Sequence, residues 1–411
     1  MTSMKPKLWA ASALTLFVFS SNPAFAEDTA PKSDLDAAIE AIKPIFAARL
    51  RYETVDQDGI AETADALTYR FRAGFETGEI ADTKFLIEFD HVEDIVDDFN
   101  STINGKTSFP VVADPNVTEL NRLQLTNTSI PDTKVTLGRQ RIVLDDSRFV
   151  GNVGWRQNEQ TFDGLRVQNT SIGDLSIDVS YVNQINRIFG DDSPIGVWEG
   201  DNFIINASHP TPIGKVTGFA YLLDIENAGG IFSSQTIGAR LNGSQKLGEG
   251  KVSYAVSYAQ QDDYGDSPFD YSADYIFAEG TYAQNGLSAG IGYEVLGGDS
   301  ERGFQTPLAT LHKFQGWADK FLATPTTGVE DLYVKAGYAP GNVGPFKGTK
   351  FLAIYHDLSA ETGGADYGSE INLLATAKWK KLGLTLKFAD YNADEFATDT
   401  KKLWFQVDYA F

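Results

Sequence analysis

The chain has 411 residues, and its 56 Asp and Glu against 34 Lys and Arg give a formal net charge of -22 at pH 7. So acidic a chain is a poor partner for nucleic acid, and we expect no such partner. It has no cysteine, which excludes disulfides and thiolate metal sites. Beyond the first 26 residues, no stretch approaches the roughly 18 apolar residues that a transmembrane helix needs, which excludes a helical membrane transporter.

The first residues have the layout of a secretory signal peptide. Lys5 and Lys7 precede the apolar run 8–19, and small residues at Ala24 and Ala26 provide a cleavage site. We therefore expect a signal peptide over 1–26, with the mature chain beginning near Glu27.

The next segment, 27–43, does not alternate between apolar and polar residues. Leu35, Ala38, Ile39 and Ile42 recur at helical spacing, and Pro44 would end a helix. This spacing predicts a short periplasmic helix or an inward plug, with a mobile leader as the alternative.

From residue 44 to the end, apolar and polar residues alternate in segments of about ten, as in strands that face lipid on one side and water on the other. The last segment is typical, since Leu403, Phe405 and Val407 share one face while Gln406 and Asp408 share the other. We predict strands over 44–54, 67–77, 83–92, 118–128, 133–143, 160–169, 174–183, 201–209, 214–225, 235–245, 251–260, 271–283, 286–295, 330–339, 348–357, 368–379, 382–391 and 402–411.

The connections between these segments alternate between short turns and long loops, of which the longest are 93–117, 144–159, 184–200 and 296–329. Bacterial outer-membrane barrels have short periplasmic turns and longer extracellular loops, and both chain ends in the periplasm require an even strand number. We therefore expect 44–411 to be one all-β transmembrane antiparallel barrel of about 18 strands in the outer membrane of a Gram-negative bacterium. Its partners would be outer-membrane lipid, lipopolysaccharide and the barrel-assembly machinery. The aromatic terminus Phe411 resembles the carboxyl-terminal signal used in the assembly of such barrels.

The second face of the strands is polar, which indicates a water-filled lumen. Arginines lie on this face in the first half of the chain, and charged lumen residues set the selectivity of such channels. They either form a basic wall or are neutralised by carboxylates such as Glu88 and Asp178 on the same faces. The predicted pore-lining cations are Arg49, Arg51, Arg70, Arg72, Arg122, Arg139, Arg141 and Arg166.

Two of these arginines conflict with simple alternation, because Arg139 and Arg141 share parity with the apolar Val135 and Leu137. A β-bulge at Gly138 would turn both inward, or they would lie above the apolar band. In the longest loop, apolar residues at three-residue spacing end on Trp317 and suggest a helical turn at the mouth. Trp317 would narrow the pore or hold a sugar ring, or the loop would simply be pinned to the wall.

Several runs resemble the alginate export porin family, and the resemblance spans most of the mature chain. The resemblance implies an 18-stranded barrel in which arginines meet an anionic polysaccharide, and by position it implies that role for Arg139 and Arg141. The runs that carry it are Leu137–Arg148, 155–158, 162–166, 100–107 with 110–115, and 306–319.

We expect a channel for small or oligomeric solutes, with sugars and organic anions ahead of other substrates. The alternative is an export port for an anionic polysaccharide such as alginate, working with periplasmic export partners; a structural or adhesive barrel and a barrel enzyme are further alternatives. The four histidines are scattered, and Ser208 and His209 would point to opposite faces of a strand, so we assign no catalytic residue. No ordered calcium loop is present, and we assign no metal and no cofactor.

Overall fold

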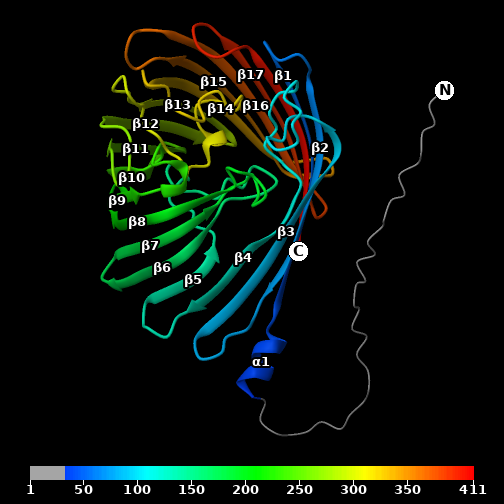
Figure 1. The fold of residues 1–411 in the computed structure, drawn as a ribbon, viewed down its shortest axis with the longest axis vertical. Helices are drawn as coiled ribbons and strands as arrows, with labels where there is room; N and C mark the ends of the chain where they lie inside the picture. The colour runs from blue at the N-terminus through cyan, green and yellow to red at the C-terminus, as the bar shows by residue number, and fades with distance from the viewer. Residues whose placement is uncertain (1–32) are drawn as a thin grey trace, which may run out of the picture.

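The computed structural model describes residues 33–411, and in this range eighteen antiparallel strands form one sheet (Figure 1). The strands are β1 (Lys43–Gln57), β2 (Ala64–Glu76), β3 (Thr83–Asp98), β4 (Val117–Asn127), β5 (Thr133–Gln140), β6 (Thr161–Ile172), β7 (Leu175–Asn186), β8 (Val197–Thr211), β9 (Gly214–Leu223), β10 (Ser234–Leu247), β11 (Gly250–Asp262), β12 (Ser272–Gln284), β13 (Leu287–Leu296), β14 (Val329–Val343), β15 (Phe346–Ser359), β16 (Asp366–Trp379), β17 (Leu382–Ala393) and β18 (Thr400–Ala410).

The sheet closes on itself. Each strand pairs with the next along the chain, and β1 also pairs with β18, from Ala47 opposite Ala410 to Gln57 opposite Thr400. Closure leaves no strand edge unpaired, which is what a β-structure needs in lipid, where no water is present to satisfy backbone groups. The predicted all-β barrel of eighteen strands, with short turns alternating with long loops, is confirmed.

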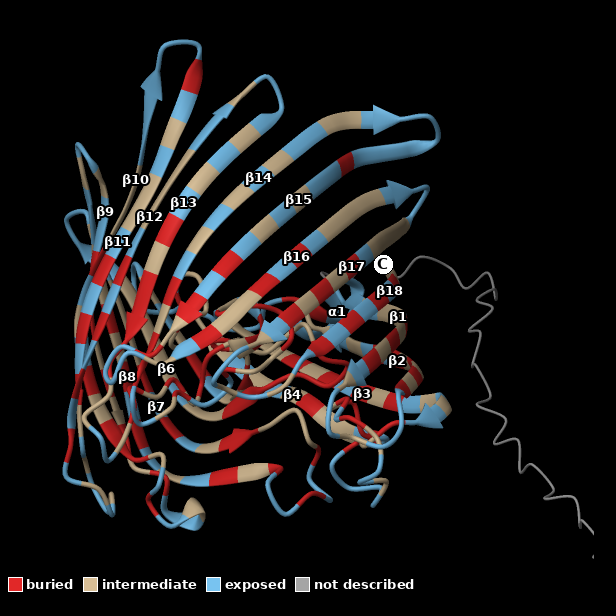
Figure 2. Cartoon of the chain, turned by 90° about the horizontal axis from the view of Figure 1, so that it is seen from above, coloured by how far each residue is buried: buried red, intermediate tan, exposed pale blue. Residues whose placement is uncertain are grey.

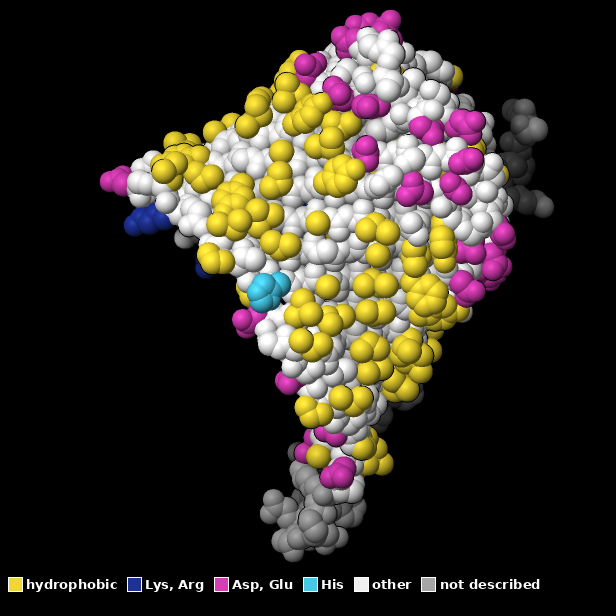
Figure 3. Space-filling view, turned by 90° about the vertical axis from the view of Figure 1, so that its left-hand side faces the viewer, with side chains coloured by type: hydrophobic (Ala, Val, Ile, Leu, Met, Phe, Trp, Pro, Cys, Tyr) yellow, Lys and Arg dark blue, Asp and Glu magenta, His cyan; other side chains and the backbone are white. Residues whose placement is uncertain are grey.

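The outer face of the wall is apolar. Phe71, Phe89, Leu125 and Leu137, on β2 to β5, are each 46–55 % exposed. Hydrophobic side chains cover the wall in Figure 3, while Asp and Glu gather toward the top and right of that view. An apolar wall facing outward is the surface that a lipid bilayer requires. Among residues 33–411, no helix is long and apolar enough to cross a membrane.

One helix precedes the barrel. In α1 (Asp34–Glu40), Ser33 and Asp36 form a capping box, and the Gly78 N–H donates to the Ala38 carbonyl across 3.0 Å. The helix therefore lies against the short turn after β2, outside the barrel at the start of β1 (Figure 1). The expected signal peptide, 1–26, lies outside the described residues.

The barrel interior differs from the simple water-filled lumen that the polar faces predicted. Three long loops fold inward, and we call 99–116, 141–160 and 297–328 the inward loops. Phe149 of the second packs on Phe219 and Tyr275 of the wall and Phe304 of the third, with ring centroids 4.9–6.1 Å apart. Buried residues are concentrated in the part of the barrel that these loops occupy (Figure 2), so this part holds an apolar core.

The inward turn also shortens β5. Residues 141–143 were predicted to continue the strand, but β5 ends at Gln140. Ile142 and Leu144 are 1 % and 7 % exposed within the interior core. Burial of these two side chains against the inner wall outweighs the few ladder hydrogen bonds that three more strand residues would add.

Deleting Phe411 is expected to impair assembly of the barrel without destabilising the assembled form. Its backbone N–H donates to the Phe46 carbonyl across 2.9 Å, but its side chain is 74 % exposed and packs on little. Heat-modifiable electrophoresis of outer-membrane fractions should show less folded barrel, whereas Phe411→Trp, which keeps an aromatic terminus, should assemble normally. Equal amounts of folded barrel in all three proteins would contradict the role of Phe411 in assembly.

Candidate functional site: the arginine row and the inward loops

Seven of the eight predicted arginines lie along one arc of the inner wall, which we call the arginine row. It comprises Arg49 and Arg51 on β1, Arg70 and Arg72 on β2, Arg122 on β4, Arg141 just beyond β5, and Arg166 on β6. The pairing places them in adjacent positions, with Arg49 opposite Arg70 and Arg122 opposite Glu88 of β3. The arc therefore runs from β1 to β6 without a break.

Carboxylates interleave with the row. Arg72 donates two hydrogen bonds to Asp90 (2.5 and 2.6 Å), and Arg122 donates two to Glu88 (2.6 and 2.8 Å). On β6, Arg166 binds Asp178 in the same bidentate way. Glu88 and Asp90 are almost completely buried. These three arginines are thus each held in place by an acid, and cations alternate with carboxylates along this part of the row.

The β1 and β2 arginines hold the 141–160 loop. Arg49 donates to the carbonyls of Gly154, Trp155 and Arg156 at 3.0–3.2 Å, and Arg70 donates to that of Gln157 at 3.1 Å. Arg51, which is fully buried, donates to the Trp155 carbonyl and lies over the Trp155 ring at 4.2 Å. These arginines bind loop backbone, which leaves them little surface for a solute.

Arg139 and Arg141 are placed differently from the expectation of a bulge at Gly138. Strand β5 pairs through this position with both neighbours without a register shift. Arg139 therefore stays on the outer face that Leu137 and Leu123 share. It lies at the end of β5, where it donates two hydrogen bonds to Asp163 (2.8 and 2.9 Å). Gly138 has φ +110°, and a Cβ there would lie 2.3 Å from a backbone oxygen of β4, so only glycine fits.

Arg141 lies beyond the strand end and turns into the barrel. Its guanidinium donates to Glu159 of the same loop (2.6 Å) and to Glu88 (2.9 Å). Burial raises the pKa of Glu159, but Arg72 and Arg141 outweigh it and lower that pKa to about 2. Of Arg139 and Arg141, Arg141 is the one that a solute in the lumen could reach.

The 297–328 loop is anchored by a buried charge cluster centred on Asp319. Asp319 accepts hydrogen bonds from Lys402 Nζ (2.8 Å) on β18 and from Arg156 (3.3 Å), and it binds His312 Nδ1 (2.7 Å). Burial raises the pKa of Asp319, but its cationic neighbours hold it well below the usual range. Asp319 therefore ties the loop to the wall as a carboxylate.

The 141–160 and 297–328 loops also bind each other. The Gly151 N–H donates to the Leu308 carbonyl (2.9 Å), and the Thr310 N–H donates to that of Ser147 (3.0 Å). A Cβ on Gly151 would lie 2.4 Å from the Thr310 hydroxyl, so glycine permits the close approach. Arg148, which is 1 % exposed, donates to Glu294 of β13 (2.7 Å) and to Thr306 (3.0 Å). The loops form one unit attached to the wall on several sides.

Trp317 is part of this attachment. Its backbone N–H donates to Glu370 of β16, its ring is covered by Lys387 of β17 at 3.8 Å, and it is 7 % exposed. The helical turn expected near it is a single 3-10 turn, η2 (Leu311–Lys313). So buried a ring has little face to offer a sugar, and the geometry favours the alternative in which Trp317 pins the loop.

Several residues of the site were not predicted from the sequence, among them Glu159, Arg156, Arg148, Asp319 and Lys387. They lie inside long connections or on distant strands, where alternation carries no information about contacts. A signal did exist, because the loops combine aromatic residues with arginines and acids, a composition that solvated loops do not need.

Comparisons with known proteins give the fold. No protein-family model matches the chain, and no curated protein matches it. Among solved structures it is similar to OccK9 (OpdG) of Pseudomonas aeruginosa, with a TM-score of 0.71 and 16% identity over 91% of this chain and 100% of that chain. It is also similar to OpdK of the same organism with vanillate (TM-score 0.69, 13% identity, 91% and 99% covered) and to OccAB4 of Acinetobacter baumannii (TM-score 0.68, 16% identity, 90% and 98% covered). The chain thus has the fold of these outer-membrane porins, and the expected barrel of eighteen strands is confirmed.

The resemblance to the alginate export porin family is wrong, because these structural neighbours are Occ porins. The run Leu137–Arg148 that carried it has a local explanation in this barrel. Gly138 fits a tight strand contact, Arg139 and Arg141 bind Asp163, Glu88 and Glu159, and Arg148 anchors the loop to Glu294. The associated hypothesis of a polysaccharide export port falls with the resemblance.

Proposed function

We propose that the protein is an outer-membrane channel for small organic anions. The observation that carries this proposal is the arginine row, which spans the inner wall from β1 to β6 where the inward loops narrow the barrel. Guanidinium groups bind carboxylates in a bidentate manner, as Arg139 and Arg166 do with Asp163 and Asp178. The solved neighbour OpdK binds vanillate, an organic anion. Sugars, the other predicted solutes, would make less use of the arginines.

A near-neutral ladder suits transport better than a bare basic wall. Binding must be favourable enough for a solute to enter and weak enough for it to leave. Glu88 and Glu159 already occupy the donors of Arg141, so an arriving carboxylate exchanges one acid for another rather than filling an empty site. We therefore expect weak, rapidly reversible binding of anions along the row.

Neutralising Arg141, the most exposed member of the row, should weaken the preference for anions. In Arg141→Gln, Glu88 and Glu159 lose a cationic partner, so the local potential becomes more negative. Reversal potentials of the reconstituted channel in a KCl gradient should show the chloride-to-potassium permeability ratio fall by about twofold or more. Lys246→Gln, which removes an exposed cation near the short turn after β10, is the matched control and should leave the ratio unchanged.

Two results would contradict the proposal. One is a folded, reconstituted barrel that does not conduct. The other is a permeability ratio that is the same in the wild type and in Arg141→Gln. Heat-modifiable electrophoresis of each variant shows whether the barrel is folded, and Arg141→Lys, which keeps the charge, should retain the wild-type ratio.

A further inference from the structure

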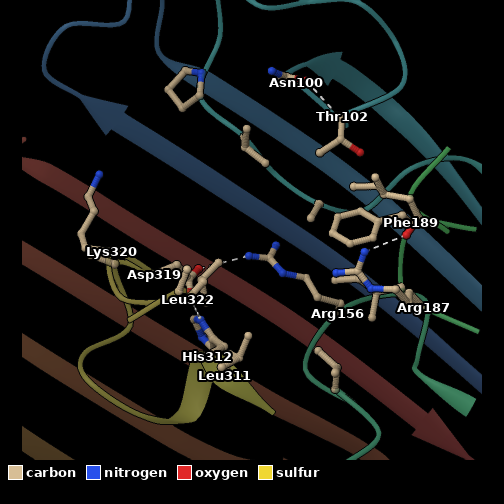
Figure 4. A pocket seen from close by; sticks show the side chains of 18 of the residues that line it. Asn100, Thr102, Arg156, Arg187, Phe189, Leu311, His312, Asp319, Lys320 and Leu322 are labelled. Atoms are coloured by element: carbon tan, nitrogen blue, oxygen red, sulfur yellow. Dashed lines mark hydrogen bonds and ion pairs between the residues drawn. The ribbon is translucent and has the colours of Figure 1, made fainter. Parts of the chain in front are cut away.

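The outer mouth of the barrel contains a cavity of about 560 Å³, lined by the 99–116 loop, the loop after β7 and the 297–328 loop. Figure 4 shows it, with Arg187 and Phe189 on one side and Asp319, His312 and Lys320 on the other. Cavities of roughly 300–1,000 Å³ hold organic ligands of several rings. It is separate from the arginine row, of which no member lines it.

Most of the cavity wall is apolar. Ile188, Phe189 and Trp198 come from the loop after β7 and the start of β8, Phe109 comes from the 99–116 loop, and Leu322 comes from the 297–328 loop. These apolar side chains replace none of the hydration that a sugar would lose on binding. They favour a ligand with an apolar body.

The charged residues that line the cavity are mostly cationic, whereas the protein as a whole is acidic. The lining contains Arg156, Arg187, Lys320 and Lys402 but only one acid, Asp319, in a chain with a net charge of -22. Asp319 is already engaged by Arg156 and Lys402. Two cations, Arg187 and Lys320, form no ion pair within residues 33–411.

Arg187 is held so that its donors remain available. Its guanidinium lies 3.7 Å from the Trp198 ring centroid and 4.7 Å from that of Phe189, and Nη1 donates to the Ile195 carbonyl across 2.8 Å. The rings occupy the faces of the guanidinium and fix its plane, while its remaining N–H groups have no partner among the described residues. Burial lowers the pKa of Arg187 to about 10, which still leaves it charged at pH 7.

We propose that this cavity is a capture site for amphipathic organic anions, in which the apolar body lies against Phe189, Ile188 and Leu322 and the carboxylate binds Arg187 or Lys320. The inference rests on the proposed function and names its substrate class. This class comprises aryl carboxylates of one to three rings and branched-alkyl carboxylates. Anions captured here would be delivered to the arginine row below, which explains how so acidic a protein could collect anions.

Titration calorimetry of the refolded protein in micelles with 2-naphthoate tests the site without requiring conduction. Wild-type protein should bind 2-naphthoate, whereas acetate and neutral 2-naphthalenemethanol should bind at least about tenfold more weakly. Arg187→Gln and Lys320→Gln should each weaken 2-naphthoate binding, together by about tenfold or more. Lys106→Gln, a cation of the 99–116 loop that does not line the cavity, is the matched control and should bind as the wild type does.

The outcomes separate the two proposals. Equal affinity for acetate and 2-naphthoate, or an equal loss in Lys106→Gln and Arg187→Gln, would overturn the capture site and leave the channel proposal standing if the barrel conducts. A barrel that does not conduct but binds 2-naphthoate through Arg187 and Lys320 would overturn the channel and support the site. As a second variant, Phe189→Ala should weaken 2-naphthoate binding while acetate binding stays the same.

Discussion

Replacing Asp319 with alanine is expected to release the 297–328 loop from the barrel wall. Asp319 is the acid shared by Lys402, Arg156 and His312, and its side chain is only 7 % exposed. Removing one partner of a buried ion pair costs about 3–5 kcal/mol because it leaves an uncompensated charge in a poorly solvated place. Here Arg156 would keep Glu53 and Asp114, whereas Lys402 would lose the one acid with which it pairs among residues 33–411.

Limited trypsin digestion should detect the release, since Lys313 and Lys320 lie in this loop. Cleavage after these lysines should be faster in Asp319→Ala than in the wild type, while the barrel itself stays heat-modifiable. Glu301→Ala, which removes an exposed acid from the same loop, is the matched control and should be cleaved at the wild-type rate. Cleavage of Asp319→Ala at that same rate would show that the charge cluster does not anchor the loop.

The strands could be predicted from the sequence because each of them carries its own signal. In β2, Phe71 faces out and Arg70 and Arg72 face in, and the period of two that separates them is visible in the sequence alone. The count of eighteen then follows from the turns. The shortening of β5 could not be predicted, because it depends on Ile142 and Leu144 being buried against parts of the chain far away in sequence.

The site could be predicted only in part for a related reason. Strand parity identifies which arginines face the interior but not what they meet there. Arg51 and Arg70 looked like pore-lining cations, yet they are buried under the backbone of the 141–160 loop. The run Leu137–Arg148 was equally misleading. It suggested the alginate export porin family, but contacts within this barrel account for several of its residues.

The inward loops therefore decide what the pore is. In a barrel without the inward loops, the arginine row would be a wide basic surface, and its charge would act at long range. With the loops in place, the buried members of the row become anchors, and Arg141, its most exposed member, remains open to solutes. Selectivity and loop attachment are thus carried by the same set of ion pairs.

Removing the 297–328 loop should enlarge the channel. Leu296 and Val329, which flank it, are directly paired across β13 and β14, so a two-residue Asn-Gly turn can join them without disturbing the ladder. The deletion takes away Phe304, Leu308 and Trp317, which fill the interior core. Single-channel conductance should rise by at least about twofold, because conductance grows with the open cross-section of a pore.

The comparison that isolates this effect is a short deletion in a loop that does not enter the barrel. Gly363 and Gly364, between β15 and β16, are exposed with open space around them, and their removal should leave the conductance as it is. The large deletion uncovers Phe219 and Tyr275 on the inner wall, so its folding must be checked by heat-modifiable electrophoresis in the same preparation. If the folded deletion variant conducts no more than the wild type, then the narrowest part of the channel lies elsewhere, with the 141–160 loop and Arg141 as its remaining boundary.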